Sequence, residues 1–383
     1  MSASAAKDLF IGRPRSGGKI KLVEALRGIA ALYVFAHHFA HDYLALEHPR
    51  ISRLFVFGQV AVLVFFVLSG FVISFSTSAR GKTLEFWPYF VRRFRRIYPI
   101  FCAALMLGYA MACVEAGAWV PLRGRDLIGN LLMLQDGAKA GTWFSPYWEN
   151  SPLWSLSYEW FFYMGFFVVS KVLATSEWLQ KYAVLAFGLL GALAYRLVPN
   201  QFSFFAMYFI IWWSGVEFAR EYARTGFITV RKQWVNVALI AVMSVPFALA
   251  VLAARRAGSA LSLYEHPLIE LRHFATALVL LVFGLVWNAL GFWGLRRATR
   301  FGLWFGQLSY ALYVFHRPML SLLSRYRLTP WLVADLALWL GPLTILLAYT
   351  FEVLLQPRIN RFFPAVSRAE AVAPHRTLPN DAR

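Results

Sequence analysis

Residues 22–41 read Leu22-Val-Glu-Ala-Leu-Arg-Gly-Ile-Ala-Ala-Leu-Tyr-Val-Phe-Ala-His-His-Phe-Ala-His41. The stretch is mostly apolar over the roughly 20 residues that a helix needs to cross a bilayer. It still contains Arg27 and three histidines, and an ionisable group inside a span costs at least about 2.5–3.5 kcal/mol. It is too long for a cleaved signal peptide and has no small-residue cleavage site. We therefore expect a first membrane span that carries functional groups.

Nine further apolar runs of similar length follow. They begin near Leu54, Ile97, Leu153, Tyr182, Phe202, Trp234, Leu271, Phe301 and Trp331. Of the 383 residues, 59% are hydrophobic and 15% charged, whereas a soluble domain carries about 45–50% apolar and 25% charged residues. This apolar surplus excludes a soluble globular enzyme and a disordered chain. The expected fold class is all-α: a polytopic transmembrane helical bundle with about ten transmembrane helices.

The chain is strongly basic, with 38 Lys and Arg against 19 Asp and Glu. These cations lie between the apolar runs, as an excess of basic residues in cytoplasmic loops predicts, so we expect no nucleic-acid partner. With a cytoplasmic N-terminus, about 25 of the 38 cations fall on the cytoplasmic side, and ten spans return the C-terminus there. We expect a cytoplasmic N-terminal segment over residues 1–20, a transmembrane domain over 21–363 and a flexible cytoplasmic tail over 364–383.

Arg27 and His38 are the first candidate site residues. Eleven residues in a helix make three turns plus about 20°, so both lie on one face, about 16 Å apart along the axis. Arg27 then lies near the cytoplasmic side and His38 beyond the midplane, where a histidine can act as a general base. Arg27 pairing with Glu24, and a structural role for His38, remain open alternatives.

No metal site is expected. His37 and His41 have acceptable spacing for a metal pair but lack further ligands, and solvation at the membrane interface explains them better. The two cysteines, Cys102 and Cys113, lie in one apolar run and behave as small hydrophobic residues.

Four arginines stand at the cytoplasmic mouth of the third span: Arg92, Arg93, Arg95 and Arg96. Guanidinium groups bind phosphate with two hydrogen bonds at once, so the cluster predicts a site for a cosubstrate that bears phosphate. Topology and binding to anionic lipid headgroups are the alternatives.

Two later spans add polar groups in their outer halves. Glu159 lies one to two turns into an aromatic span, and His316 precedes Pro318, which can free backbone carbonyls in the helix. A structural histidine is the alternative for His316. The longest outer loop, residues 118–152, contains Trp148 and Glu149 among several aromatic and acidic residues, which suit either a membrane edge or stacking on sugar rings.

Five segments resemble, in order and spacing, the acyltransferase 3 family of membrane acyltransferases. They are the Leu-Arg-Gly segment with its Arg27-x10-His38 spacing, Phe65-Phe-Val-Leu-Ser-Gly-Phe71, Arg92-Arg-x-x-Arg-Ile-x-Pro99, Trp154-Ser-Leu-Ser-Tyr-Glu159 and Ser309-Tyr-x-Leu-Tyr-x-x-His-x-Pro318. The resemblance covers about residues 20 to 360. It implies ten helices, acyl-CoA (usually acetyl-CoA) as the donor, and O-acylation of extracytoplasmic or lipid-linked carbohydrates such as lipopolysaccharide and exopolysaccharide in the bacterial inner membrane.

The resemblance also implies roles for individual residues. Arg27 and His38 match a pair that family members need for activity, and Arg92, Arg93 and Arg96 match a basic motif. Glu159 and His316 match recurrent polar positions. Many relatives carry an acidic residue where this chain has Leu63. If that carboxylate orients the histidine, another group does so here, and we expect Glu159.

The functional hypothesis is therefore O-acetyl transfer from cytoplasmic acyl-CoA to a carbohydrate acceptor. The arginines would hold the donor's phosphates, and His38 would act as general base for direct transfer or as a nucleophile. Further candidate partners are the lipid bilayer, polysaccharide-assembly proteins and a second copy of the chain. A secondary transporter of an anionic or sugar-linked solute, and a scaffold of polysaccharide assembly, are the alternatives.

Overall fold

The computed structural model describes residues 21–45, 48–78, 84–137, 140–262, 265–291, 295–326 and 331–364. The expected N-terminal segment 1–20, and all of the expected tail except Pro364, lie outside the described residues.

The fold is all-α, as expected, and apart from one isolated β-bridge between Gln135 and Phe144 the described residues contain no strand. The first half holds α2 (Lys21–Phe39), η1 (Ala40–Leu44), α3 (Pro49–Ser52), η2 (Arg53–Phe55), α4 (Gly58–Ser78), α5 (Phe86–Ala116), α6 (Gly124–Leu131), η3 (Tyr147–Glu149), η4 (Ser151–Leu153) and α7 (Trp154–Val172). The second half holds α8 (Glu177–Leu197), α9 (Gln201–Thr225), α10 (Val230–Arg256), α11 (Leu268–Ala289), α12 (Leu295–Gly306), α13 (Ser309–Arg325), α14 (Leu332–Asp335), η5 (Leu336–Leu340), α15 (Gly341–Tyr349), η6 (Thr350–Leu355) and α16 (Gln356–Phe362).

Six helical segments among the described residues are long and apolar enough to cross a membrane. They are Pro49–Ser78, Phe86–Ala116, Gln201–Thr225, Val230–Arg256, Leu268–Ala289 and Val333–Phe362. The first predicted span corresponds to α2, and α7, α8 and α13 stand at three more of the predicted places. The count of about ten spans and the cytoplasmic position of both termini stay predictions.

Two predicted boundaries differ from the structure. The third predicted span is helix α5, which begins at Phe86 and not near Ile97. The four arginines of the cluster therefore lie within the helix and are distributed around its axis. The predicted span from Phe301 is divided into α12 and α13 by a turn, in which the Ser309 hydroxyl donates to the Gly306 carbonyl at 2.8 Å.

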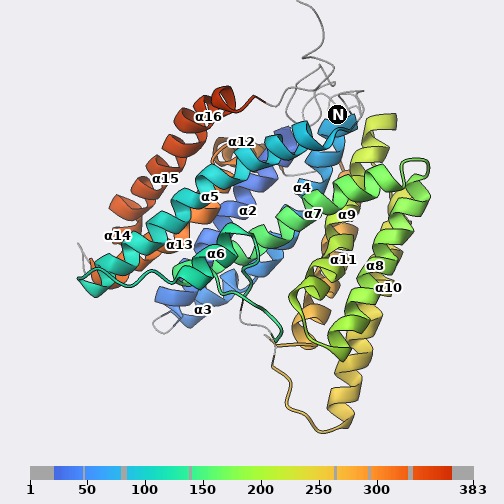
Figure 1. The fold of residues 1–383 in the computed structure, drawn as a ribbon, viewed down its shortest axis with the longest axis horizontal. Helices are drawn as coiled ribbons and strands as arrows, with labels where there is room; N and C mark the ends of the chain where they lie inside the picture. Colours follow the sequence, from blue (N-terminus) through green and yellow to red (C-terminus); the bar gives the residue numbers. More distant parts are fainter. Residues whose placement is uncertain are drawn as a thin grey trace, which may run out of the picture.

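Helix α9 forms the core of the bundle and is almost entirely buried between α4 and α8 (Figure 1). The backbones of α4 and α9 touch at Gly70 and Gly215, where a Cβ on either glycine would overlap a carbonyl oxygen of the other helix. In a membrane the hydrophobic effect does not drive helices together. Small residues let the helices approach closely, and van der Waals contacts then stabilise the pair.

Helix α2 is fixed against α12 in the same way. A Cβ on Gly28 would overlap the Gly302 carbonyl oxygen, and one on Gly302 would overlap the carbonyl oxygen of Ala25. Gly28, the residue after Arg27, therefore sets the angle at which α2 crosses α12 near that arginine.

The segment before α7 enters the bundle and does not remain at its edge. Pro318 has no N–H to donate to the Val314 carbonyl, four residues earlier in α13. The Asn150 side chain donates to that carbonyl instead, at 3.0 Å, from a position where Asn150 is 1% exposed. The expectation that Pro318 frees a carbonyl is confirmed, and helix α7 consequently begins inside the bundle.

Gly215 offers a test of the α4–α9 contact. Gly215→Ala must push the helices apart, because the added methyl overlaps the Val67 carbonyl oxygen, so we expect the midpoint of thermal unfolding in detergent to fall. Gly284→Ala is the matched control: nothing lies within 4 Å of its Cβ position, and alanine favours a helix by about 1 kcal/mol over glycine. Equal midpoints for the two variants would contradict the close contact.

Candidate active site

The bundle has two ends, and polar groups gather at different depths between them. One end carries the start of α2 and of α5, and the other carries the end of α2 and the segment before α7 (Figure 1). We call them the arginine end and the histidine end after Arg27 and His38.

A cavity of about 200 Å³ lies toward the arginine end. It is lined by Arg27, Phe65, Phe66, Ser69, Val72, Ile73, Arg93, Arg96, Ser155, Leu156, Glu159, Tyr163, Ser309, Tyr310 and Tyr313. We call it the arginine cavity. It brings together Arg27, Arg93, Arg96 and Glu159, four of the residues that the sequence singled out.

The two α5 arginines in this cavity are held differently. Arg96 donates to both carboxylate oxygens of Glu352, one of them at 3.0 Å, and lies 5.4 Å from the Tyr310 ring centroid. Arg93 lies over the rings of Tyr89 and Tyr163, at 5.2 and 5.6 Å, and its Nε is buried without a hydrogen-bond partner. Arg93 therefore keeps a donor that an incoming anion can satisfy.

The other two arginines of the cluster do not line the arginine cavity. Arg95 donates to the Phe363 carbonyl at 2.7 Å, at the end of α16, and its own carbonyl accepts from Gln356. The reason is helical facing: Arg95 lies about 200° around the helix from Arg93. Arg92 is also outside the cavity lining.

The sequence had suggested that Glu159 lies beside His38. In the structure it lines the arginine cavity instead. It accepts hydrogen bonds from the hydroxyls of Ser69, at 2.6 Å, and of Tyr163. Because α7 starts inside the bundle, Glu159 is deeper than a span starting at the membrane surface would place it.

A second cavity, of about 260 Å³, lies toward the histidine end. We call it the histidine cavity; it is lined by Val34, His37, His38, Gly58, Gln59, Val62, Asp136, Gly137, Ser151, Pro152, Trp154, Ile269, His273 and Tyr313. It contains His38 itself. His316 is fully buried directly behind His38.

The hydrogen bonds of the two histidines fix which nitrogen carries the proton. His316 Nδ1 lies 2.7 Å from the Tyr313 carbonyl oxygen, which can only accept, so Nδ1 is protonated and Nε2 carries the lone pair. His38 Nδ1 lies 3.2 Å from that Nε2 and 3.0 Å from the Val34 carbonyl, both acceptors. The proton of His38 is therefore on Nδ1, and its Nε2 is free to accept a proton. His316 takes the orienting role that we had assigned to Glu159.

Gln59 also lines the histidine cavity, and its side chain is held in place. Arg272 donates to its Oε1, and His273 Nε2 lies 2.8 Å from that oxygen. Since the oxygen can only accept, His273 is protonated on Nε2, and its Nδ1 accepts from the Tyr208 hydroxyl at 2.6 Å. With the amide oxygen engaged twice, the amide N–H groups are what Gln59 can offer to a ligand.

Tyr313 separates the two cavities, because it lines both. Its hydroxyl lies 2.7 Å from Ser155 Oγ and 2.8 Å from the Pro152 carbonyl, and its ring packs against Phe65 at 5.6 Å. Tyr313 is therefore a side chain that the two cavities share.

The other histidines of α2 and η1 have local roles. The His37 ring bonds the Phe55 carbonyl, and the exposed His41 lies 3.0 Å from the Asp42 carboxylate. Within the described part of the chain, no group of three or more metal-ligating side chains is found.

Sequence reasoning missed several contributors. His273 and Glu352 are ionisable residues within apolar runs, which is the signal that could have found them, and Tyr313 belongs to the Ser309–Pro318 segment that resembles the family. Gln59 gave no signal. The structure makes Glu352 the partner of Arg96, and Glu352 lies in a π-helical turn of the kind that often marks functional sites.

A comparison with known protein families identifies the family of the chain. A family model described as an acyltransferase domain, Acyl_transf_3, matches residues 20–353. The chain belongs to the acyltransferase 3 family. This membership supports a membrane acyltransferase and favours an enzyme over a transporter or a scaffold.

One curated relative is acyltransferase MdmB of Streptomyces mycarofaciens, 31% identical over 153 residues, or 39% of this chain and 38% of the relative. The match thus spans less than two fifths of that protein's length. No solved structure matches the chain.

Proposed function

We propose that this acyltransferase transfers an acyl group, most simply acetyl, from cytoplasmic acyl-CoA to a hydroxyl of an extracytoplasmic or lipid-linked carbohydrate, such as exopolysaccharide or lipopolysaccharide. The observation that carries the proposal is His38, which keeps a free lone pair on Nε2 and lines a cavity adjoining one lined by three arginines. On this proposal the protein lies in a bacterial inner membrane with its arginine end toward the cytoplasm.

The arginine cavity suits the donor. Arg27, Arg93 and Arg96 supply cations for phosphate groups, and the unpartnered Nε of Arg93 is a donor that an anion would satisfy. Arg92 and Arg95 have no part in donor binding on this proposal, because neither lines the cavity. The thioester end would extend past Tyr313 toward His38.

The chemistry is direct transfer. His38 Nε2 accepts the proton of the acceptor hydroxyl as its oxygen attacks the thioester carbonyl carbon. The carbon–sulfur bond then breaks, and the imidazolium returns the proton to the departing sulfur, which leaves as a thiol. His316 keeps the His38 ring in the required orientation throughout, because the His316 Nε2 lone pair accepts a hydrogen bond from the Nδ1–H of His38.

Gln59 is placed to stabilise the charge that develops on the carbonyl oxygen. The amide is oriented before the reaction by Arg272 and His273, so donating an N–H to the oxyanion requires no reorganisation. Tyr208 and His273 act as positioning residues for this amide.

The histidine pair gives the first test of the proposal. His38→Ala should lower the rate of radiolabelled acetyl transfer from acetyl-CoA by about 10²–10⁴-fold, the usual contribution of a general base. His316→Ala should cost about tenfold, the effect of one hydrogen bond of roughly 1.5 kcal/mol. His41→Ala is the control and should stay close to wild type, since this side chain is 74% exposed. Full activity of His38→Ala in correctly inserted protein would remove His38 from the mechanism.

The arginines predict a separate effect on the donor. Arg93→Gln should raise the KM for acetyl-CoA about tenfold or more, because a charge-assisted hydrogen bond contributes about 1.5–3 kcal/mol. Arg95→Gln is the matched control, two residues away on the opposite face of α5, and should leave that KM unchanged. Equal KM values for the two variants would favour a purely topological role for the cluster.

Gln59 predicts an effect on kcat. Gln59→Leu should lower kcat by about 10²–10³-fold with little change in the KM for acetyl-CoA, as expected when one oxyanion donor is lost. Tyr208→Phe should give a smaller loss of kcat, since it removes only the hydroxyl that bonds His273. An unchanged kcat in Gln59→Leu would exclude this role.

A further inference from the structure

The contact between His38 and His316 depends on how two helices lie against each other. The His38 ring is fixed on its own helix by the Val34 carbonyl, and the His316 ring by the Tyr313 carbonyl. Neither bond sets the distance between the two rings, which is 3.2 Å from Nδ1 of His38 to Nε2 of His316. That distance is at the upper end of the range for a hydrogen bond, so a small shift of one helix along the other would break it. The end of α2 must therefore be held in register with α13.

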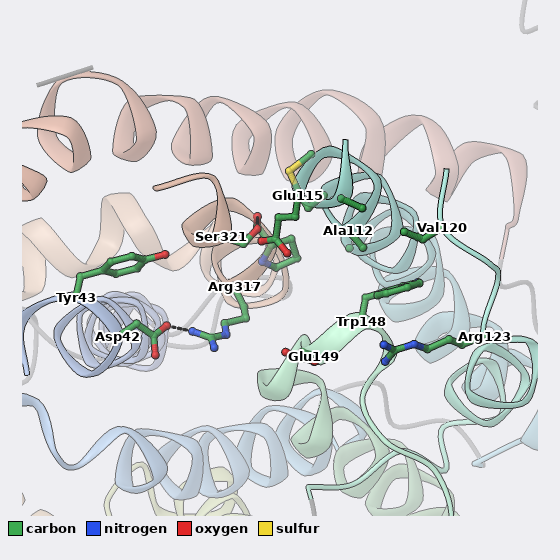
Figure 2. A pocket seen from close by; sticks show the side chains of 14 residues that line it. Asp42, Tyr43, Ala112, Glu115, Val120, Arg123, Trp148, Glu149, Arg317 and Ser321 are labelled. Carbon is green, nitrogen blue, oxygen red and sulfur yellow. Dashed lines mark hydrogen bonds and ion pairs between the residues drawn. The ribbon is translucent and has the colours of Figure 1, made fainter. Parts of the chain in front are cut away.

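Polar contacts join η1 to α13 within about one turn beyond the histidine pair. Asp42 forms an ion pair with Arg317, and the Tyr43 hydroxyl donates to the Leu320 carbonyl at 2.7 Å. Figure 2 shows Asp42, Tyr43 and Arg317 on the wall of a cavity of about 640 Å³ at the histidine end, with the ion pair drawn as a dashed line. We call the Asp42–Arg317 and Tyr43–Leu320 contacts the η1–α13 contacts.

The π-helical turn η1 lets both of its polar side chains reach α13. In a continued α-helix, Asp42 and Tyr43 would lie about 40° and 140° around the axis from His38, so Tyr43 would point well away from it. The hydrogen bonds of η1, Ala40–Leu44, span five residues instead of four, which brings Tyr43 back toward the His38 side. Turns of this kind frequently mark functional sites.

Apolar packing in the same place does not provide this register. A buried apolar cluster surrounds the end of α2, η1 and α13, and it includes Phe39, Ala40, Leu44, Met319, Leu320 and Leu323. Apolar burial is non-directional, so the cluster holds the elements together without fixing how far one lies along the other. An ion pair with a guanidinium and a hydroxyl–carbonyl hydrogen bond each require a defined direction. The η1–α13 contacts therefore fix the register.

The ion pair is partly shielded from water, with Asp42 20% and Arg317 30% exposed. Arg317 bonds one carboxylate oxygen of Asp42, and the exposed His41 lies against the other, so loss of His41 does not release Arg317. The charge of Arg317 is close enough to act on His38. Asp42 neutralises that charge beside the ring on which an imidazolium forms during the proposed transfer.

We propose that Asp42, Arg317 and Tyr43 are positioning residues, which hold α13 against the end of α2 so that His316 stays within hydrogen-bond distance of His38. They touch neither substrate. When the two charges are removed together, their effect on the rate passes through His316 alone. The proposal rests on the proposed function, because that reaction needs an oriented His38 ring.

The test removes the ion pair without changing the net charge. Asp42→Ala is combined with Arg317→Met in the full-length protein, and acetyl transfer from radiolabelled acetyl-CoA is measured in membranes of host cells that lack the gene. We expect kcat to fall by roughly three- to tenfold, no more than loss of the His38–His316 hydrogen bond itself costs, with the KM for acetyl-CoA unchanged. In a His316→Ala background, the same two substitutions should change kcat by less than about twofold, because no ring is left to position.

Control variants separate this effect from a general loss of ion pairs. Glu177→Ala with Arg224→Met removes a 2.7 Å ion pair that joins α8 to α9, again without a change in net charge, and should leave kcat unchanged. Arg317→Lys keeps a cation for Asp42 and should retain most of the wild-type kcat.

The possible outcomes are distinct. An unchanged kcat in the Asp42→Ala/Arg317→Met protein, or an equal loss with and without His316, would overturn the proposal. If that protein does not insert into the membrane, Tyr43→Phe carries the test, because it removes one hydroxyl: kcat should fall about two- to threefold, again only when His316 is present. No loss of kcat in Tyr43→Phe would then overturn the proposal.

Failure of the proposed function gives a different result. Acetyl transfer by the wild type no greater than by His38→Ala would contradict the proposed function itself. Transfer that depends on His38 and His316 but not on the η1–α13 contacts would contradict only the positioning role.

Discussion

The hydrogen bond from Asn150 to the Val314 carbonyl is the contact on which the arrangement of the site depends. Pro318 leaves that carbonyl without its helical partner, and an unpaired backbone group inside the bundle would cost several kcal/mol. Asn150 can satisfy it only if the segment before α7 enters the bundle. This one requirement sets the depth at which α7 starts and the level of Glu159, and it positions the segment that contains Trp148.

The same rule, that a buried polar group needs a partner, explains why each functional side chain has a defined orientation. His38, which lines the histidine cavity, keeps its Nε2 free because His316 and the Val34 carbonyl occupy its Nδ1. Gln59 has its N–H groups left for a ligand because Arg272 and His273 occupy its oxygen. Pro99 has no N–H to donate to the Arg95 carbonyl, just as Pro318 has none for the Val314 carbonyl. The Gln356 side chain donates to the Arg95 carbonyl instead, which joins α5 to α16.

The arrangement also keeps the two halves of the proposed reaction apart. The arginine and histidine cavities share Tyr313 as a wall, and Tyr313 is held by Ser155, Pro152 and Phe65. A donor among the arginines and an acceptor at the histidine end would therefore approach His38 from opposite directions. Such separation suits a reaction that joins reactants from two sides of a membrane.

The sequence by itself determined the all-α class, the places of the long helices, and the placement of Arg27 and His38 on one helix at different depths. These follow from hydropathy and from the 3.6-residue period, which are local properties. It also indicated that Pro318 frees a carbonyl. Only the tertiary structure decided that Arg95 turns away from the cavity, that Glu352 holds Arg96, and that His316 and not Glu159 supports His38. These outcomes depend on where helices start, on π-helical turns and on glycine contacts that set helix angles. A shift of one turn moves a side chain by about 5 Å, more than the length of a hydrogen bond, so no single-helix pattern could have identified the partners.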